Sequence, residues 1–250
     1  MGKNNQNIII AGPCAIETKK VFFDTLESIN EYVDVFRAGV WKARTSPKNY
    51  KGIGIQGIEW INQAQKKYNK PFAIEVGSAK HVEIALNNNI RILWIGARTT
   101  CNPFSVQEIC EATKGENVEI WIKNPMFSSV ELWIGAIERF EESKTQKIKI
   151  IHRGFYTENT GQYRNLPRWD IVKKIREKYL EIPVICDPSH MAGNTHLIQD
   201  ICLDALNHNI HGFMIEVHQN PEIALSDKGQ QLDPKSFYRL MQKLNLTKPS

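Results

Sequence analysis

The residues of this sequence that are best suited to chemistry follow short apolar runs, at the points where buried strands would end. Cys14 follows "NIIIAGP", and Lys42 and Arg44 follow "VFRAGVW". Further runs end in or next to Glu75, Arg98, Lys123, Arg153, the pair Asp187 and His190, and Glu216. One charged residue at a strand end is usually solvated. The repetition of this ending along the whole chain indicates a shared site.

The cations of this set predict an anionic ligand. An unpaired buried cation is costly to desolvate, and cations crowded around one point repel each other. Phosphates and carboxylates remove both costs, and arginine binds either group through two parallel hydrogen bonds. We therefore expect a ligand with at least two anionic groups. The cations in question are Arg37, Lys42, Arg44, Arg98, Lys123 and Arg153.

Four other residues have the chemistry of metal ligands: Cys14, His190, Glu216 and Asp227. A thiolate, an imidazole and two carboxylates suit a divalent ion such as Mn²⁺, Fe²⁺, Co²⁺ or Zn²⁺. No HxH or CxxC spacing accompanies them, and a lone cysteine is more often a small buried hydrophobe. Spacing alone leaves both interpretations open.

These residues need a scaffold that gathers distant segments. The predicted strands are 7–14, 35–42, 71–77, 92–97, 118–124, 147–155, 182–188 and 212–217. Helical periodicity lies between them, as at 19–32, 58–68, 129–143 and 167–179, and a last helix is expected at 234–245. Nearly continuous apolar strands are typical of a parallel sheet that helices cover. We expect an α/β fold, a (β/α)₈ TIM barrel that forms a single domain over residues 1–250, with every strand end at one mouth.

A doubly wound dinucleotide-binding fold is the main alternative. Gly52, Gly54 and Gly57 match G-x-G-x-x-G, and Glu75 follows at a suitable distance. In a true fingerprint the glycines come directly after the first strand. Here "ARTSPKNYK" intervenes after Lys42. The context therefore argues against a nucleotide cofactor.

Composition narrows the partners and the compartment. The 250 residues carry a net charge of +5 but no dense basic run with interleaved aromatics, which argues against nucleic acid. The N-terminus lacks an apolar signal core, and no apolar run reaches the ~18 residues of a membrane span. Five cysteines without a CxxC pair are typical of a reducing compartment. We expect a cytoplasmic protein with no membrane partner.

The ordered strings of the chain resemble one family. "AGPC", "KARTS", "IGARTT", "IKN", "HRG", "DPSH", "IEVH" and "LSDKGQQL" follow one another between about residues 8 and 234. Together they resemble the type I 3-deoxy-D-arabino-heptulosonate-7-phosphate (DAHP) synthases, most closely the β subgroup. That family condenses phosphoenolpyruvate with D-erythrose 4-phosphate and water on a metal-bearing barrel and releases phosphate. The reaction opens the shikimate pathway of aromatic amino acid biosynthesis.

The resemblance implies a role for each matching residue. Cys14, His190, Glu216 and Asp227 would hold the metal. Arg37, Lys42, Arg98, Lys123 and Arg153 would surround phosphoenolpyruvate, and Arg44, Thr45 and Ser46 would hold the aldose phosphate. Lys42 would protonate the new alkoxide or help to orient the aldehyde, and Glu75 or Asp187 would assist the attacking water.

Three positions depart from the family pattern, and none removes a proposed ligand. Ala43 replaces the proline of "KPRTS", "IKNP" replaces "LKRG", and Asn194 stands where relatives often carry arginine. The related 3-deoxy-D-manno-octulosonate-8-phosphate synthases, which use arabinose 5-phosphate, show "KANRSS" where this chain has "KARTS". We therefore favour the erythrose substrate. A non-catalytic barrel that partners a shikimate-pathway enzyme would predict a lost ligand, and all four are present.

Family habit implies a homodimer or homotetramer. Members often carry a regulatory or chorismate mutase domain, so three alternatives stay open: an unregulated form, a piece cut from a longer protein, or control by another chain such as a chorismate mutase or a regulatory chain. We expect no regulatory or chorismate mutase domain within these residues.

Overall fold

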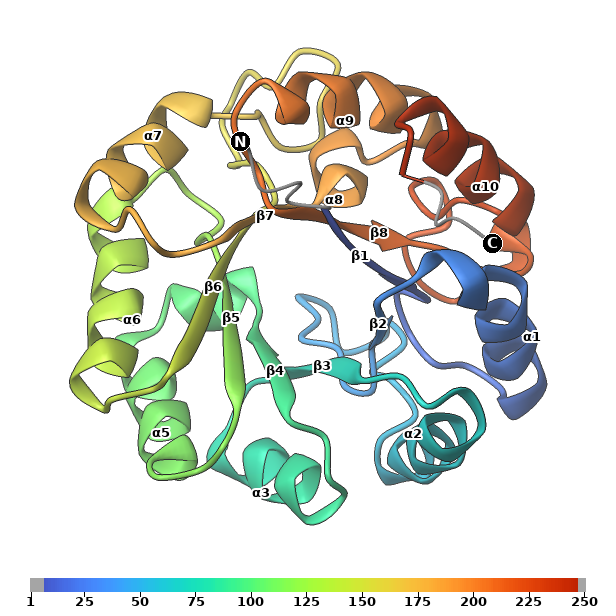
Figure 1. Ribbon diagram of the computed structural model, residues 1–250, viewed down its shortest axis with the longest axis horizontal. Helices are drawn as coiled ribbons and strands as arrows, with labels where there is room; N and C mark the ends of the chain where they lie inside the picture. Colours follow the sequence, from blue (N-terminus) through green and yellow to red (C-terminus); the bar gives the residue numbers. More distant parts are fainter. Residues whose placement is uncertain (1–6, 247–250) are drawn as a thin grey trace, which may run out of the picture.

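The computed structural model describes residues 7–246, and their eight parallel strands close into a barrel in chain order, with β8 beside β1 (Figure 1). The strands are β1 (Ile8–Gly12), β2 (Val35–Ala38), β3 (Phe72–Val76), β4 (Ile92–Ile95), β5 (Glu119–Lys123), β6 (Lys147–His152), β7 (Val184–Cys186) and β8 (Gly212–Glu216). The expected (β/α)₈ TIM barrel is confirmed.

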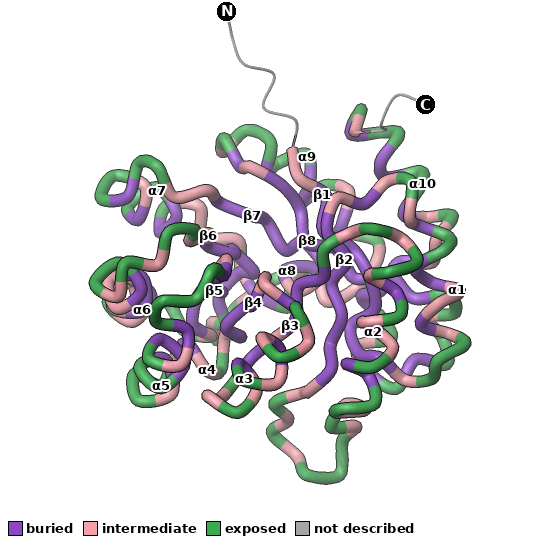
Figure 2. The backbone as a smooth tube through the Cα atoms, turned by 60° about the horizontal axis from the view of Figure 1, so that its bottom comes forward, coloured by how far each residue is buried: buried purple, intermediate pink, exposed green. Residues whose placement is uncertain are grey.

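Helices surround the barrel and turn their exposed faces outward (Figure 2). The outer helices are α1 (Lys19–Ile29), α2 (Ile55–Tyr68), α3 (Ala79–Asn87), α5 (Pro103–Thr113), α6 (Val130–Glu142), α7 (Trp169–Lys178), α9 (Ile198–Leu206) and α10 (Pro234–Lys243). Shorter helices occupy connections: η1 (Asn30–Tyr32), α4 (Ala97–Thr100), α8 (Pro188–Ala192), η2 (Thr195–Leu197) and η3 (Pro221–Ile223). Among the described residues, no helix combines the length and apolar character that a membrane crossing requires.

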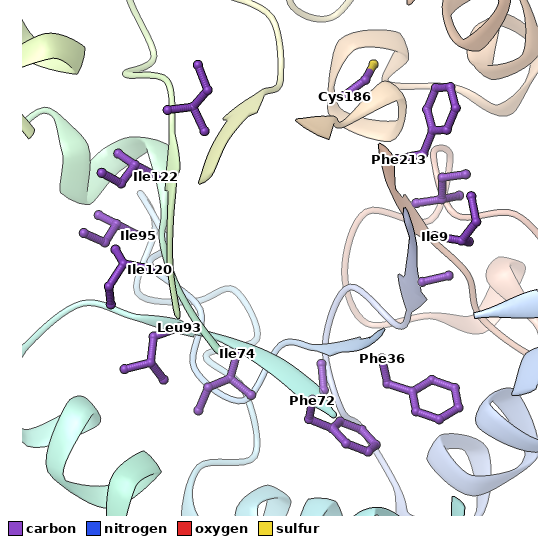
Figure 3. Close-up of a cluster of buried hydrophobic side chains, with 14 of the residues drawn as sticks. Ile9, Phe36, Phe72, Ile74, Leu93, Ile95, Ile120, Ile122, Cys186 and Phe213 are labelled. Carbon is purple, nitrogen blue, oxygen red and sulfur yellow. The ribbon is translucent and has the colours of Figure 1, made fainter. Parts of the chain in front are cut away.

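Strand alternation creates two apolar layers. Outward side chains such as Phe36, Phe72 and Leu93 pack between the barrel and the helices (Figure 3). The inward side chains Ile10, Val35, Ala73, Trp94, Trp121, Ile151, Ile185 and Met214 fill the barrel itself. Because side chains alternate along a strand, the residue two positions beyond an inward apolar residue also faces inward. This spacing places Arg37, Glu75, Lys123, Asp187 and Glu216 immediately above the inner layer.

Several strands are shorter than their apolar runs predicted. The run 35–42 leaves the sheet after Ala38, because the chain there turns across the end of β1. Gly39 accepts a hydrogen bond from the amide of Ile16 at 2.9 Å. A Cβ on Gly39 would lie 1.9 Å from the carbonyl oxygen of Cys14, so only glycine allows this approach. Lys42 therefore belongs to a loop and not to the strand.

As the sequence predicted, the glycine-rich segment 52–57 does not follow β2 directly: a long loop lies between them. Gly54 precedes α2, and residues 39–54 separate this helix from β2. Gly52 adopts φ +91° and packs against the carbonyl of Val40, where a Cβ would be 2.1 Å from the oxygen. These glycines build the β2–α2 connection, and they lack the direct strand-to-helix turn that cradles a dinucleotide.

Candidate active site

A cavity of about 290 Å³ lies at the carboxyl ends of the strands. It brings together residues that are far apart in the chain. Of the residues predicted from the sequence, Lys42, Arg44, Glu75, Arg98, Lys123, Arg153, His190 and Asp227 line it. With Arg164, six cationic side chains face one cavity. The predicted convergence of the strand ends is present in the structure.

Two buried ion pairs form the base of this cavity. Arg37 Nη2 lies 3.1 Å from Glu216 Oε1, with both side chains at most 1% exposed. Lys123 Nζ donates to Asp187 Oδ2 at 2.7 Å. The ring of Trp94 lies below both cations, 5.1 Å from Arg37 Cζ and 5.7 Å from Lys123 Nζ. A cation–π platform and two carboxylates thus offset cations that would otherwise be unpaired in the barrel.

Three of the predicted metal ligands meet beside the cavity. Cys14, Glu216 and Asp227 each offer a ligand atom, and these atoms lie within 4.8 Å of one another. Cys14 Sγ donates to Asp227 Oδ2 at 3.1 Å. Burial, with the nearby Glu216 carboxylate, raises the pKa of the Cys14 thiol to about 12. A divalent ion bound here would deprotonate the thiol and balance the two carboxylates.

His190 completes this set. Its Nε2 lies 3.8 Å from Glu216 Oε1, and its Nδ1 lies 2.9 Å from Asp187 Oδ2. Burial lowers the pKa of His190, which favours the neutral imidazole that binds metals. A proton on Nδ1, directed at Asp187, leaves Nε2 as the ligand atom. Glu216 Oε1 is paired with Arg37 by charge, but it accepts no well-aligned hydrogen bond from the residues described. A thiol, an imidazole and two carboxylates in this arrangement fit a divalent ion.

Asp187 is buried behind the cavity and does not line it. Its Oδ1 accepts a hydrogen bond from the backbone N–H of His190 at 3.1 Å. Burial alone would raise the pKa of Asp187, but His190 and Lys123 lower it well below its usual value, so the carboxylate is ionised. This geometry holds Lys123 and His190 in place. Glu75, in contrast, lines the cavity and packs against Gly96, where a Cβ would lie 2.0 Å from Glu75 Oε1.

The loop after β2 brings some of its predicted residues to the cavity. Lys42 Nζ donates to the carbonyl oxygen of Cys14 at 3.0 Å, and Arg44 Nε donates to that of Tyr50 at 2.9 Å. Thr45 and Ser46 do not line the cavity, and Thr45 is exposed. The structure thus places Arg44 in the site, while the roles of Thr45 and Ser46 stay predictions.

Sequence reasoning missed residues from two connections. Arg164 and Asn165 come from the long segment between β6 and α7, which carries no strand-end signal. Gln230 Nε2 donates to Glu216 Oε2 at 2.7 Å, and Gln231 Oε1 accepts from the amide of Cys14 at 2.9 Å. Both glutamines belong to the quoted string "LSDKGQQL", which was the available signal for them.

Arg164 connects the two groups of residues. Its Nη1 lies 3.1 Å from Asp227 Oδ1 and 2.6 Å from Gln230 Oε1. Asp227 therefore uses Oδ1 for this cation and presents Oδ2 to Cys14. The arginine orients one of the predicted metal ligands.

A parallel (β/α)₈ barrel with a polycationic mouth beside a thiol, an imidazole and two carboxylates defines a class: barrel enzymes for phosphorylated, carboxylated substrates. The sequence matches the DAHP synthetase I family over residues 1–248, and the chain belongs to that family. The family expected from the sequence motifs is thereby confirmed.

The similar proteins agree with this assignment. Phospho-2-dehydro-3-deoxyheptonate aldolase of Thermotoga maritima is 31% identical over 243 residues, which cover 96% of this chain and 70% of that protein. The crystal structure of the DAHP synthase from Thermotoga maritima superposes with a TM-score of 0.86 at 30% identity, covering 97% of this chain and 69% of the other. A 2-dehydro-3-deoxyphosphooctonate aldolase of Fusobacterium nucleatum is 25% identical over 260 residues, covering 96% of this chain and 90% of that protein.

The buried pair below the cavity gives the first prediction. Arg37→Met should lower the free energy of unfolding by about 3–5 kcal/mol in the presence of chelator, because it leaves the Glu216 carboxylate buried without its partner. Arg91→Met, which breaks the exposed pair of Arg91 with Glu116, should cost less than about 1 kcal/mol. Urea denaturation measures both. A cost below about 1 kcal/mol for Arg37→Met would contradict the proposed charge balance.

Proposed function

We propose that this protein condenses phosphoenolpyruvate with D-erythrose 4-phosphate and water to give DAHP and phosphate. One observation carries the proposal: six cations and the set Cys14, His190, Glu216 and Asp227 converge on a single barrel mouth. Two phosphates and a carboxylate require about that many donors. Membership of the DAHP synthetase I family and the Thermotoga maritima relatives support the same reaction.

Phosphoenolpyruvate would bind over the inner end of the cavity. Arg98, Lys123 and Arg153 all line it, and the last two are at most 7% exposed. Buried cations attract phosphate and carboxylate more strongly than solvated cations do, because little water screens them. Arg44 extends from the β2–α2 loop and would take the phosphate of the aldose.

The condensation joins C3 of phosphoenolpyruvate to C1 of the aldose. As this bond forms, the aldehyde oxygen becomes an alkoxide and C2 gains positive character. Burial alone would lower the pKa of Lys42, but Cys14, Glu75 and Glu216 raise it, so its ammonium group is charged and can protonate the alkoxide.

Water then adds at C2. Glu75 lines the cavity and would accept the proton that this water loses. The bond between C2 and the phosphate oxygen then breaks, the C2 hydroxyl passes its proton to the departing phosphate, and C2 becomes the ketone of the product. Asp187 would act by fixing Lys123 and His190.

Cys14, His190, Glu216 and Asp227 would hold a divalent ion, Mn²⁺, Fe²⁺, Co²⁺ or Zn²⁺. When bound, such an ion supplies Lewis acidity toward the aldehyde oxygen. A cytoplasmic location, a homo-oligomer and a chorismate mutase or regulatory partner stay predictions.

A substrate comparison tests the proposed reaction. Loss of phosphoenolpyruvate absorbance should require Mn²⁺ and erythrose 4-phosphate, and it should stop with chelator. Arabinose 5-phosphate should support little or no loss. Consumption with arabinose 5-phosphate alone would instead assign the protein to 3-deoxy-D-manno-octulosonate-8-phosphate synthesis, the alternative considered from the sequence. No consumption from folded protein with either sugar would sink both enzymatic assignments.

Cys14→Ala tests the metal set. Turnover should fall below detection while the circular dichroism spectrum stays that of the parent protein, because a ligand is removed and the buried site loses only a small side chain. Mn²⁺ binding, followed by electron paramagnetic resonance, should weaken at least about tenfold. Cys202→Ala removes another buried thiol, from α9, and should leave turnover and Mn²⁺ binding unchanged. Full activity of Cys14→Ala with Mn²⁺ would refute the assignment.

Arg44→Ala tests the division of the cavity. The KM for erythrose 4-phosphate should rise about 10- to 100-fold, the loss expected for a charge-assisted contact, while the KM for phosphoenolpyruvate changes little. Lys48→Ala is the matched control, because it removes an exposed cation of the same loop that does not line the cavity. Equal effects of Arg44→Ala on both KM values would place Arg44 outside the aldose phosphate site.

A further inference from the structure

Asn165 occupies a junction between the phosphoenolpyruvate cations and the predicted metal ligands. It lies on the segment 155–166, which folds back as Phe155 and Leu166 exchange backbone hydrogen bonds of 3.0 and 2.8 Å. Its own amide N–H donates to the carbonyl of Met191 at 3.1 Å. The side chain is nearly fully buried, at 4% exposure, although the rest of this connection is largely exposed.

Both polar atoms of the Asn165 carboxamide have a partner at this junction. Its Oδ1 accepts a hydrogen bond from Arg153 Nη1 at 3.0 Å, and its Nδ2 donates to the carbonyl oxygen of His190 at 2.6 Å. Arginine can only donate and a carbonyl can only accept, so these two partners fix the orientation of the amide. The Asn165 side chain thus fixes the orientation of the Arg153 guanidinium and holds the backbone at His190.

The charge of Arg153 is not neutralised at this contact. Its side chain is 7% exposed, and among the described residues its guanidinium donates to a neutral amide and forms no ion pair with a carboxylate. Burial lowers the pKa of Arg153 to about 10, still far above neutrality; the carboxylate of Asp187 opposes this shift, and the nearby cations Arg164 and Arg98 add to it. A buried charged guanidinium without a carboxylate is a binding group for an anion.

The fold holds this junction closely. Gly154 follows Arg153 with φ +76°, and a Cβ there would lie 2.5 Å from the carbonyl oxygen of Asn165. Asn124 Oδ1 accepts from the amide of Arg153 at 2.8 Å. The backbone of Arg153 is therefore fixed by other residues, and Asn165 is left to fix its side chain.

We infer that Asn165 is a positioning residue that orients Arg153 toward phosphoenolpyruvate through a neutral dipole and so preserves the charge that binds the substrate. The inference rests on the proposed function. An aspartate in this place would make a stronger bond to Arg153, but it would compete with the substrate anion for the same guanidinium.

Two substitutions separate this role from simple packing. Asn165→Ala removes the orientation of Arg153 but keeps its charge, so the Kd for phosphoenolpyruvate should rise about 5- to 10-fold. Asn165→Asp keeps the shape but neutralises the cation, so the Kd should rise at least about 30-fold. Both variants also lose the hydrogen bond from Nδ2 to the carbonyl oxygen of His190, so a purely structural role predicts a loss of Mn²⁺ affinity at least as large as the loss of phosphoenolpyruvate affinity.

Calorimetric titration with phosphoenolpyruvate alone gives these Kd values, and steady-state kinetics gives the KM for each substrate. The KM for erythrose 4-phosphate should change less than about threefold in both variants, because Arg153 does not hold the aldose. The Mn²⁺ affinity should also change less than the phosphoenolpyruvate affinity. Asn62→Asp is the matched control, since it makes the same change at a half-buried amide on α2, and it should bind phosphoenolpyruvate like the parent protein.

Several outcomes would overturn the inference. These are a Kd for Asn165→Asp equal to or below that of Asn165→Ala, an unchanged Kd for Asn165→Ala, or a larger loss of Mn²⁺ affinity than of phosphoenolpyruvate affinity. If Asn165→Asp does not fold, the Asn165→Ala titration still decides. A parent protein that binds phosphoenolpyruvate but turns it over with neither sugar would defeat the proposed reaction and leave this inference testable by titration.

Discussion

The balance of buried charge is the constraint on which the rest of this structure depends. Arg37 and Lys123 would be prohibitively costly in the barrel without Glu216 and Asp187, and each pair lies within 3.1 Å. Arg153 is different, because it is nearly as buried but its guanidinium, among the residues that the structure describes, hydrogen-bonds to the neutral amide of Asn165 and pairs with no carboxylate. Carboxylates thus neutralise Arg37 and Lys123 at the base of the cavity, whereas Arg153 keeps a charge that an anionic ligand could pair with.

The charges of the predicted metal ligands are also only partly balanced by cations. Cys14, Glu216 and Asp227 crowd together, and their nearest cations, Arg37 and Arg164, each contact one carboxylate oxygen. Glu216 Oε1, which pairs with Arg37, also lies 3.8 Å from His190 Nε2, and Glu216 Oε2 accepts from Gln230. Asp227 Oδ2, the oxygen that Arg164 leaves free, accepts from Cys14. Under the proposed function, this distribution of charge would let an anionic substrate and a divalent ion bind side by side, and each would relieve the repulsion among the ligands of its own site.

The departures from the family pattern have local physical explanations. Asn124, in "IKNP", binds the amide of Arg153 and the carbonyl of Gly154, so it ties the end of β5 to the loop that presents Arg153. Asn194 accepts hydrogen bonds from the amides of His196 and Leu197 and caps η2. Both changes replace a long cation with a short amide that stabilises backbone, and the cavity keeps its cations.

The sequence by itself determined the barrel and most of its mouth. Continuous apolar strands at regular spacing can be buried on both faces only inside a ring of helices, and a reactive residue at each strand end then has one place to lie. The motifs marked Arg37, Lys123 and Glu216 as residues of this mouth, and in the structure the period of two along each strand turns them inward. Only the tertiary structure decided that Asp187 supports its neighbours from behind, that Thr45 is exposed, and that Arg164 and Asn165 enter the site. Their loop has no periodicity. Its path depends on backbone contacts with Met191 and on the room left by Gly193, both from a different connection, and on the close approach that Gly154 allows.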